Sequence, residues 1–245
     1  MSFLFILRLY ILDKTFVLRE FSNPFHATIF FMKEAYFQPD TLQILSSQWL
    51  EKYGRPKKIL RQPFKIQDAC LLILDMQRYF LDENSHAWVP SGEVIIPGLN
   101  KAARYFRDAG RPVIATQHIN TTDNAGMMGS WWSELLLEDH ALIDIDSDLE
   151  IQPQEILQKS QYDAFINSKL ESRLAEQGVK QVVIGGVMAH LCCETTARAA
   201  FGRGFEVFFL VDGTATYNQD YHQATLLNLA HGVAVLTTIN QVIKG

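Results

Sequence analysis

The chain has 245 residues, of which 48% are hydrophobic and 20% are charged; this balance indicates a folded globular protein and excludes a wholly disordered one. Its 22 basic residues against 27 acidic residues give a formal net charge of -5, and because there is no long basic run, nucleic acid is not expected as a partner. The three cysteines, two of them adjacent, suit neither a disulfide framework nor a zinc knuckle, so a reducing, cytoplasmic compartment is the expected location.

The first residues of the chain form an apolar segment. Residues 1–12 (MSFLFILRLYIL) are interrupted by Arg8, are too short for a membrane span, and lack the basic start and the cleavage site of a signal peptide. We therefore expect no association with a membrane. Three interpretations stay open: a signal peptide after all, an oligomer contact, or residues that precede a natural start at Met32.

The next part of the chain is expected to form a helix and a connector. Apolar residues recur at helical spacing over residues 41–53, and a Gly-Arg-Pro sequence ends the pattern, which predicts one amphipathic helix lying on the main domain. The basic, proline-containing stretch 55–65 is typical of an extended connector. We therefore divide the chain into an N-terminal extension, residues 1–65, which the chemistry does not require, and one domain over residues 66–245.

The remaining chain alternates between strand-like and helix-like segments. Short apolar runs predict strands at 69–74, 112–116, 181–186, 206–211 and 233–238, with a weaker candidate at 156–158. Helices are predicted around 99–106, 170–175, 192–203 and 219–231. This alternation predicts an α/β fold, a three-layer sandwich in which a mostly parallel sheet of about six strands has helices on both faces.

Polar and reactive side chains follow the predicted strands, at the edge where open parallel sheets bind their ligands. They are Asp75, His118, Lys159, Asp212 and the adjacent Cys192 and Cys193. Either cysteine would stand in the first turn of a helix, where the free N–H groups favour a thiolate, and a nearby lysine would lower the thiol pKa further. A thiol, an amine and a carboxylate together supply a nucleophile, its electrostatic support and its base.

Three segments resemble the signatures of the isochorismatase-like cysteine hydrolase superfamily: LLILDMQ with Asp75, KSQYDAF with Lys159, and GGVMAHLCCETTARAAF with Cys192. The resemblance covers about residues 66–240, in the order found in that family. It implies a six-stranded parallel sheet of Rossmann-like topology and a catalytic triad of these three side chains. By analogy with the family, a homo-oligomer that acts on a small molecule is expected.

The resemblance also places the oxyanion hole and selects one cysteine. It implies a cis peptide bond between Val187 and Met188, and an oxyanion hole made by the backbone N–H groups of Met188 and Cys192. The family pattern G-V-x-x-x-x-C ends at Cys192, and successive helical residues point about 100° apart, so Cys193 is not expected to face the same pocket. Cys70 is expected to be a core residue.

The expected reaction is hydrolysis of an amide, carbamoyl or ureido group. Asp75 takes the proton of Cys192, the thiolate attacks the carbonyl, and the resulting thioester is hydrolysed by water. Lys159 stabilises the negative charges of the other two groups.

Metal binding is not expected. Nicotinamidases carry an Asp and several His residues after the second strand that bind a divalent metal, and here His118 and Asn120 occupy the aligned places. One imidazole and one amide make a poor metal site, so no cofactor is expected and nicotinamide becomes a less favoured substrate.

Five residues are candidates for contact with the substrate: Phe80, His118, Thr121, Trp131 and Phe165. His118 either donates a hydrogen bond to the substrate or packs the loop that carries it. Trp131 and its neighbour Trp132 either wall the pocket or pack elsewhere.

Two alternative functions remain. True isochorismatases cleave a vinyl ether and commonly have Gly in place of Cys192, yet the YDAF and WW sequences here are similar to that branch. A non-catalytic domain that binds a small molecule or acts as a scaffold is the other alternative, although the retention of all three triad members argues against it.

Overall fold

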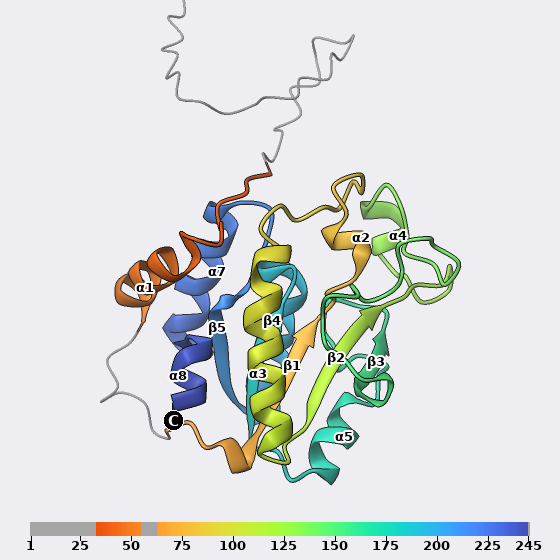
Figure 1. The fold of residues 1–245 in the computed structure, drawn as a ribbon. Coiled ribbons are helices and arrows are strands. Elements are labelled where there is room, and N and C mark those ends of the chain that lie inside the picture. The colour runs from red at the N-terminus through yellow and green to blue at the C-terminus, as the bar shows by residue number, and fades with distance from the viewer. Residues whose placement is uncertain (1–32, 55–62, 245) are drawn as a thin grey trace, which may run out of the picture. The chain divides into compact units, whose positions relative to one another are not determined.

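The core of the molecule is a six-stranded sheet, seen in a computed structural model that describes residues 33–54 and 63–244 (Figure 1). Its order is β3-β2-β1-β4-β5-β6, and every neighbouring pair is parallel. The strands are β1 (Ala69–Leu74), β2 (Val113–His118), β3 (Ile156–Lys159), β4 (Gln181–Gly186), β5 (Glu206–Thr214) and β6 (Ala234–Thr237). The predicted α/β sheet is confirmed, and it is parallel throughout.

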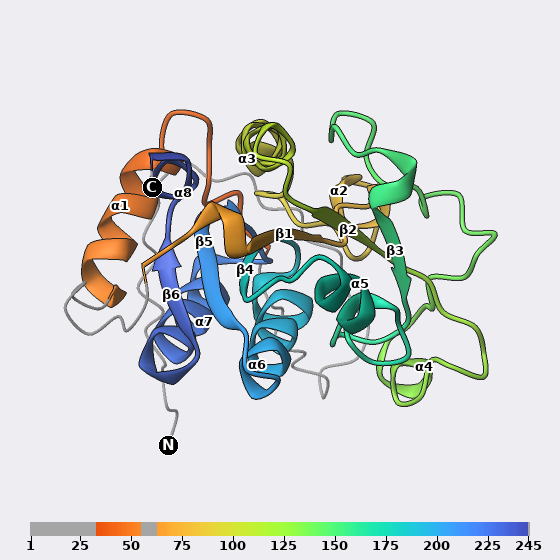
Figure 2. The same ribbon diagram turned by 90° about the horizontal axis from the view of Figure 1, so that it is seen from below.

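Helices cover both faces of this sheet (Figure 2). On one face lie α3 (Ile96–Asp108) and α8 (Ile239–Lys244), and on the other lie α5 (Leu170–Glu176), α6 (Glu194–Gly202) and α7 (Gln219–Gly232). Two helices of one turn, α2 (Arg78–Leu81) and α4 (Met128–Trp131), lie in the loops that follow β1 and β2. Short 3₁₀ turns occupy Ile66–Asp68, Glu93–Ile95 and Pro153–Glu155, and a π-helical turn occupies Ala189–Cys193.

The sequence pattern explains the central layer. All six residues of β1 and all six of β4 are buried, as expected for strands covered on both faces. These two strands pair from Ala69 opposite Gln181 to Leu74 opposite Gly186, so their carboxyl ends finish at the same level. The chain runs outward from β1 to β3 and then returns to β4, which makes the β1–β4 boundary the switch point where such sheets bind ligands.

Some element boundaries differ from the predictions. The α-helix expected from residue 192 begins at Glu194, because a π-helical turn precedes it. Strand β5 continues to Thr214, beyond the apolar run that predicted it, and the weak candidate at 156–158 is a true strand. The six-residue helix α8 was not predicted, because a segment this short shows little periodicity.

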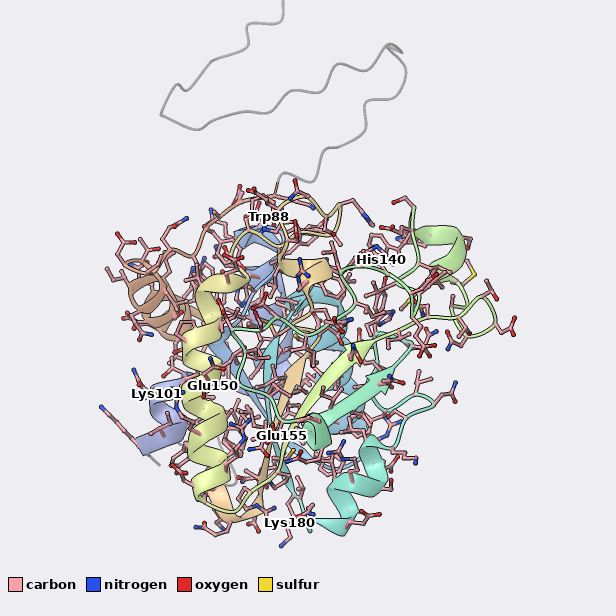
Figure 3. The ribbon with its side chains drawn as sticks, turned by 45° about the vertical axis from the view of Figure 1, so that its right-hand side comes forward. Trp88, Lys101, His140, Glu150, Glu155 and Lys180 are labelled. Atoms are coloured by element: carbon pink, nitrogen blue, oxygen red, sulfur yellow. The ribbon has the colours of Figure 1, made fainter. Side chains whose placement is uncertain are left out.

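Several charged side chains, Glu155 among them, lie on the outside of the molecule (Figure 3). One ion pair holds the residue that directly precedes β3. The Arg107 guanidinium on α3 donates two hydrogen bonds of 2.7 Å to the carboxylate of Glu155, which directly precedes β3. Hydrogen bonding to this carboxylate raises the pKa of Arg107. A bidentate pair of this kind restricts geometry as well as adding energy, so it helps to set the position of the strand that ends at Lys159.

The helix predicted over residues 41–53 is observed as α1 (Leu42–Tyr53), and it packs against β5, β6 and α7. Trp49 on α1 and Phe37 before it are 5% and 0% exposed. Burial of each such side chain contributes about 1.5–3 kcal/mol, so this part of the predicted extension belongs to the hydrophobic core. The predictions for residues 1–12 and for the connector over residues 55–62 lie outside the described residues. Within the described residues, no helix has the length and hydropathy that a membrane span requires.

A buried histidine joins this N-terminal part to α7. His222 is fully buried, and its ring contacts Phe37 and Trp49. Its Nδ1 lies 3.0 Å from the hydroxyl of Tyr36, and its Nε2 lies 3.0 Å from the hydroxyl of Thr214. Burial, assisted by His190, lowers the pKa of His222 to about 3.

Acidification is therefore expected to destabilise the fold. The folded pKa lies below the value of about 6.5 in the unfolded chain, so the unfolded state binds more protons as the pH falls below that value. Stability is full above about pH 6.5, and at pH 5 His222 alone accounts for a loss of about 2 kcal/mol. Urea unfolding of a His222→Gln variant at pH 7.5 and pH 5 should show a pH effect smaller by this amount. The exposed His231 on the same helix provides the control variant His231→Gln, and equal pH effects in the wild type and His222→Gln would refute the assignment.

Candidate active site

The carboxyl ends of β1, β3 and β4 bring together a carboxylate, an amine and a thiol. Asp75 follows β1, Lys159 ends β3, and Cys192 lies in the π-helical turn after β4. The Nζ of Lys159 lies 2.7 Å from Oδ2 of Asp75 and 3.5 Å from Sγ of Cys192. Asp75 also acts electrostatically on the Cys192 thiol, whose pKa it raises. The three residues predicted as a triad therefore form one buried cluster.

The neighbouring strand holds the Asp75 carboxylate in place. The Thr116 hydroxyl on β2 donates to Oδ1 of Asp75 at 2.6 Å and accepts from the Asp75 N–H at 3.1 Å. Asp75 has a φ of 52°, in the left-handed region that Asp adopts more readily than most residues other than glycine. This backbone turn and the Thr116 hydroxyl leave Oδ2 facing Lys159.

Lys159 is surrounded by hydrogen-bond acceptors. Besides Asp75 and Cys192, its Nζ contacts the carbonyl of Gln161 at 2.9 Å and Nδ1 of His118 at 3.2 Å. Burial lowers the pKa of Lys159, but the Asp75 carboxylate and Cys192 outweigh burial, so the pKa is raised. Lys159 is therefore a permanent ammonium group at neutral pH.

The pKa of the Cys192 thiol differs from the prediction. Burial and the Asp75 carboxylate raise the pKa of Cys192, and the opposing effect of Lys159 is too small to reverse this shift. The expectation of a lowered thiol pKa is therefore wrong, because the residue is buried beside a negative charge rather than at an open helix end. In the free protein, Cys192 is a thiol in a cluster whose carboxylate can accept its proton.

The other two cysteines do not share this position. Cys192 lines the cavity described below, whereas Cys193 is fully buried, with Sγ 3.9 Å from the carbonyl of Gly185. Cys70 lies within β1, where its thiol faces the Leu71 carbonyl at 3.6 Å. The structure thus brings Cys192, and neither of the other cysteines, into the cluster.

The loop after β4 leads from the sheet to the Cys192 thiol. The Val187–Met188 peptide bond is cis, as the resemblance implies. Ala189 N–H donates to the carbonyl of Ala215, and Cys193 N–H donates to that of Met188. Among the described residues, the N–H groups of Met188 and Cys192 donate to no backbone carbonyl outside the local helix. Both N–H groups belong to the segment that carries the thiol, and the oxyanion hole that the resemblance implies stays a prediction.

A glycine is required where this loop begins. Gly186 has a φ of 106°, and a Cβ atom there would lie 2.1 Å from the carbonyl oxygen of Leu74. That oxygen accepts the N–H of Val187 at 2.8 Å. Any larger residue at this position would push the loop away from β1, and hence would move Cys192 away from Asp75.

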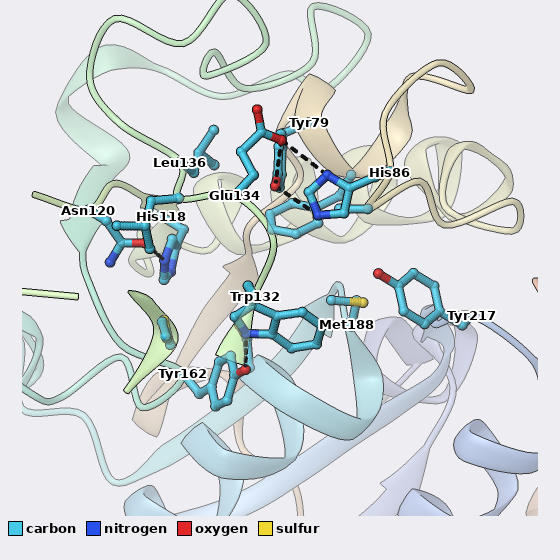
Figure 4. A pocket seen from close by; sticks show the side chains of 15 residues that line it. Tyr79, His86, His118, Asn120, Trp132, Glu134, Leu136, Tyr162, Met188 and Tyr217 are labelled. Carbon is cyan, nitrogen blue, oxygen red and sulfur yellow. Dashed lines mark hydrogen bonds and ion pairs between the residues drawn. The ribbon is translucent and has the colours of Figure 1, made fainter. Parts of the chain in front are cut away.

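Cys192 lines a cavity that is open to solvent (Figure 4). Most of its lining side chains are aromatic or aliphatic, and none of them is Lys or Arg. The lining comprises Tyr79, Phe80, His86, Ala87, His118, Asn120, Met128, Trp132, Glu134, Leu135, Leu136, Tyr162, Met188, Cys192 and Tyr217. The cavity suits a small molecule that is not an anion and whose reacting group reaches the thiol.

Two of the five predicted substrate contacts, Phe80 and His118, line this cavity, and the other three do not. Thr121 is exposed and exchanges hydrogen bonds with Asn124, which close a turn. Trp131 is 76% exposed. Phe165 stacks on Phe205 and lies under the Arg203 guanidinium, so it packs behind the site. These three predictions are wrong because the conformation of the loops decides which side chains face the cavity, and the sequence pattern does not report that conformation.

Trp132 rather than Trp131 forms part of the cavity wall. Its Nε1 donates to the hydroxyl of Tyr162 at 2.6 Å, and both side chains face the cavity (Figure 4). Opposite them, the Glu134 carboxylate lies 3.1 Å from Nδ1 of His86 and 3.3 Å from the hydroxyl of Tyr79. Except for the tryptophan pair, no sequence signal singled out these residues.

His118 is engaged on both sides of its ring. Its Nε2 lies 2.9 Å from Oδ1 of Asn120, whose amide nitrogen donates to the Ser160 carbonyl at 2.9 Å. The Asn120 oxygen therefore accepts from Nε2, and Nδ1 is free to accept from Lys159. Burial and the Lys159 ammonium lower the pKa of His118 to about 4, so the ring is neutral and orients Lys159.

This donor set does not fit a divalent metal. Both nitrogens of His118 are occupied within the fold, and Asn120 offers only an amide oxygen that is also engaged. Over residues 33–54 and 63–244, no group of three or more His, Cys, Asp or Glu side chains is arranged to hold a metal ion.

The chain is similar to known proteins over most of its length. The isochorismatase domain profile matches residues 69–241. Nicotinamidase 3 of Arabidopsis thaliana is 38% identical over 180 residues, which cover 71% of this chain and 86% of that protein. Enterobactin synthase component B of Escherichia coli K12 is 31% identical, over 74% of this chain and 64% of that longer protein.

A solved structure shows the same fold. The crystal structure of a cysteine hydrolase from Pseudomonas syringae pv. phaseolicola 1448A is similar with a TM-score of 0.71 at 24% identity, over 76% of this chain and 95% of that one. The domain match covers well over half of the chain, and it takes in all three residues of the buried cluster. This chain therefore belongs to the isochorismatase family of hydrolases.

Proposed function

We propose that the protein is a cysteine-dependent amidohydrolase that cleaves a small, uncharged amide, carbamoyl or ureido substrate through a thioester on Cys192. The observation that carries the proposal is the buried contact of Asp75, Lys159 and Cys192 at the end of a cavity into which the thiol opens. A neutral thiol beside a carboxylate and an ammonium group is a nucleophile with its base in place.

In the first step, the thiol proton passes to Oδ2 of Asp75 as Sγ forms a bond to the substrate carbonyl carbon. Because the pKa of Cys192 is raised, the sulfur carries its proton before the attack, and Asp75 has to accept that proton. Lys159 stays charged throughout and compensates the negative charge as it leaves the carboxylate and passes through the sulfur to the substrate.

The attack moves the negative charge to the carbonyl oxygen of the substrate, where the N–H groups of Met188 and Cys192 stabilise it. The C–N bond then breaks, and the leaving amine takes the proton from Asp75. A water molecule, deprotonated by the same carboxylate, attacks the thioester and releases the carboxylic acid and the thiol.

The lining of the cavity favours an uncharged substrate. Its ionisable side chains other than Cys192 are the Glu134 carboxylate, His86, the neutral His118 and tyrosines, and none supplies a permanent positive charge. The similarity to nicotinamidase 3 supports an aromatic carboxamide, although the metal ligands expected of nicotinamidases do not fit here. Isochorismate, which carries two carboxylates, would enter this cavity without a cationic partner.

A panel of substrates tests the proposal. Nicotinamide, pyrazinamide, a neutral N-carbamoyl amine, biuret and isochorismate are incubated with the wild type and with Cys192→Ala, and ammonia release and vinyl ether cleavage are followed. We expect the wild type to release ammonia from at least one amide or carbamoyl compound, and the variant to release none. Consumption of isochorismate at equal rates by both proteins would instead establish the vinyl ether hydrolase. Binding without turnover of any compound would establish the non-catalytic domain.

A further inference from the structure

Five residues at the start of the described chain, which precede α1, cross from one cavity loop to another. Residues 33–37, named here the N-terminal strap, lie outside the matched family domain at residues 69–241. They contact the loop after α2, which carries His86, and the loop after β5, which carries Tyr217. Both of these side chains line the cavity, and they lie on the same side of it (Figure 4).

The contacts with the first loop join side chains to backbone. The Lys33 ammonium donates to the carbonyl of His86. The Ser91 hydroxyl accepts the N–H of Phe37 at 3.0 Å and donates to the carbonyl of Glu34 at 3.4 Å. Since Ser91 is fully buried, the strap and this loop are fixed to each other at both ends of the contact.

The contacts with the second loop are equally direct. Glu34 N–H donates to the carbonyl of Tyr217 at 2.7 Å, and the Thr216 N–H donates to the hydroxyl of Tyr36 at 2.9 Å. The Nζ of Lys33 also lies 4.8 Å from the centroid of the Tyr217 ring, within the range of a cation–π interaction.

Lys33 is thus the one side chain of the strap that contacts residues of both cavity loops, His86 and Tyr217. Burial lowers the pKa of Lys33 to about 8, which shows that its ammonium group is partly removed from water. Cation–π contacts are stronger for a desolvated cation. The rest of the strap is anchored in the core through Phe37 and through the contact of Tyr36 with His222.

We infer that the N-terminal strap supports the part of the cavity wall formed by His86 and Tyr217, and that Lys33 is a positioning residue that sets the separation of these two side chains. The inference rests on the proposed amidohydrolase function for its kinetic consequence. It also revises the expectation that the chemistry does not require the N-terminal extension, because part of that extension shapes the cavity.

The strap acts on the wall and not on the reacting groups. Asp75, Lys159 and Cys192 are held by strands and by the loop after β4, and no contact joins Lys33 to any of them. Loosening the wall should therefore weaken substrate binding and leave the chemical step nearly unchanged.

The test compares two lysines in the full chain. Lys33→Met removes the ammonium group, whereas Lys33→Arg keeps a cation that can reach the same partners. Lys52→Met is the matched control, because the Nζ of Lys52 also lies 4.8 Å from a tyrosine ring centroid and donates a hydrogen bond, to Gln223, but on α1 and away from the cavity. Steady-state kinetics with the best amide and hydrogen exchange of residues 82–92 and 214–218 are measured for each.

We expect Lys33→Met to raise KM about five- to tenfold, to change kcat less than twofold, and to speed exchange in both loops; Lys33→Arg should restore KM to within about threefold. Lys52→Met should match the wild type. Faster exchange with an unchanged KM would overturn the role in substrate binding, and unchanged exchange would overturn the strap itself. If the wild type cleaves no amide, the proposed function fails, while the exchange comparison still decides whether Lys33 holds the two loops.

Discussion

Replacement of Cys192 by alanine is expected to lower kcat/KM for the amide substrate by about 10,000-fold or more, since a covalent catalyst that loses its nucleophile retains only binding and oxyanion stabilisation. The fold should survive, because Cys192 lines a cavity and its removal leaves Asp75 paired with Lys159. Ammonia release measures the first effect, and urea unfolding measures the second.

The adjacent cysteine supplies the control for this substitution. Cys193 is fully buried and faces the carbonyl of Gly185 rather than the cavity. Cys193→Ala should therefore cost about 1–2 kcal/mol of stability through a small void, and should leave kcat/KM within a few fold of the wild type. Equal loss of activity in the two variants would mean that the reacting sulfur has been misassigned.

Replacement of Lys159 by methionine is expected to remove activity and to destabilise the fold by about 3–5 kcal/mol, because it leaves the Asp75 carboxylate buried without its partner. Both side chains of this pair are 0% exposed, so water does not compensate for the loss. Activity should fall at least about 1,000-fold, since the charge that passes to the sulfur is no longer balanced. Equilibrium unfolding at pH 7 and the ammonia assay measure the two effects.

Two controls show whether the effect of Lys159→Met comes from the buried charge of Asp75: a variant of an exposed ion pair, and a double variant that removes both buried charges. Lys180 lies 3.9 Å from Asp68 with 75% of its side chain exposed, so Lys180→Met should cost less than about 1 kcal/mol. The double variant of Asp75→Asn with Lys159→Met removes both buried charges and should regain part of the lost stability, but none of the activity. A Lys159→Met protein as stable as the wild type would show that the pair is not buried in solution.

The positions of the three reactive residues could be predicted because they depend on strands. Continuous apolar runs identify buried parallel strands, and the residues that follow such strands meet at one edge of the sheet. Asp75 and Lys159 are placed by this rule alone. The short strand that ends at Lys159 was the weakest prediction, because its four residues include polar Gln158, which is exposed.

The cavity wall and the state of the thiol could not be predicted, since both depend on loops and burial. Trp131 and Trp132 are adjacent and chemically identical, yet the one-turn helix α4 leaves the first in solvent and turns the second toward Tyr162. Likewise, the effect of Lys159 on Cys192 was evident from the residue types, but the larger effect of burial on its pKa was not. The part played by Lys33 required knowledge of which loops it spans.

The central claim is that a thioester forms on Cys192, and rapid acid quench followed by peptide mass spectrometry tests it most directly. When the wild type is quenched during turnover of its best amide, the peptide that contains Cys192 should carry the mass of the acyl group, and Cys192→Ala should carry none. An acyl group on any other residue, or the same turnover by Cys192→Ala without an adduct, would contradict the account.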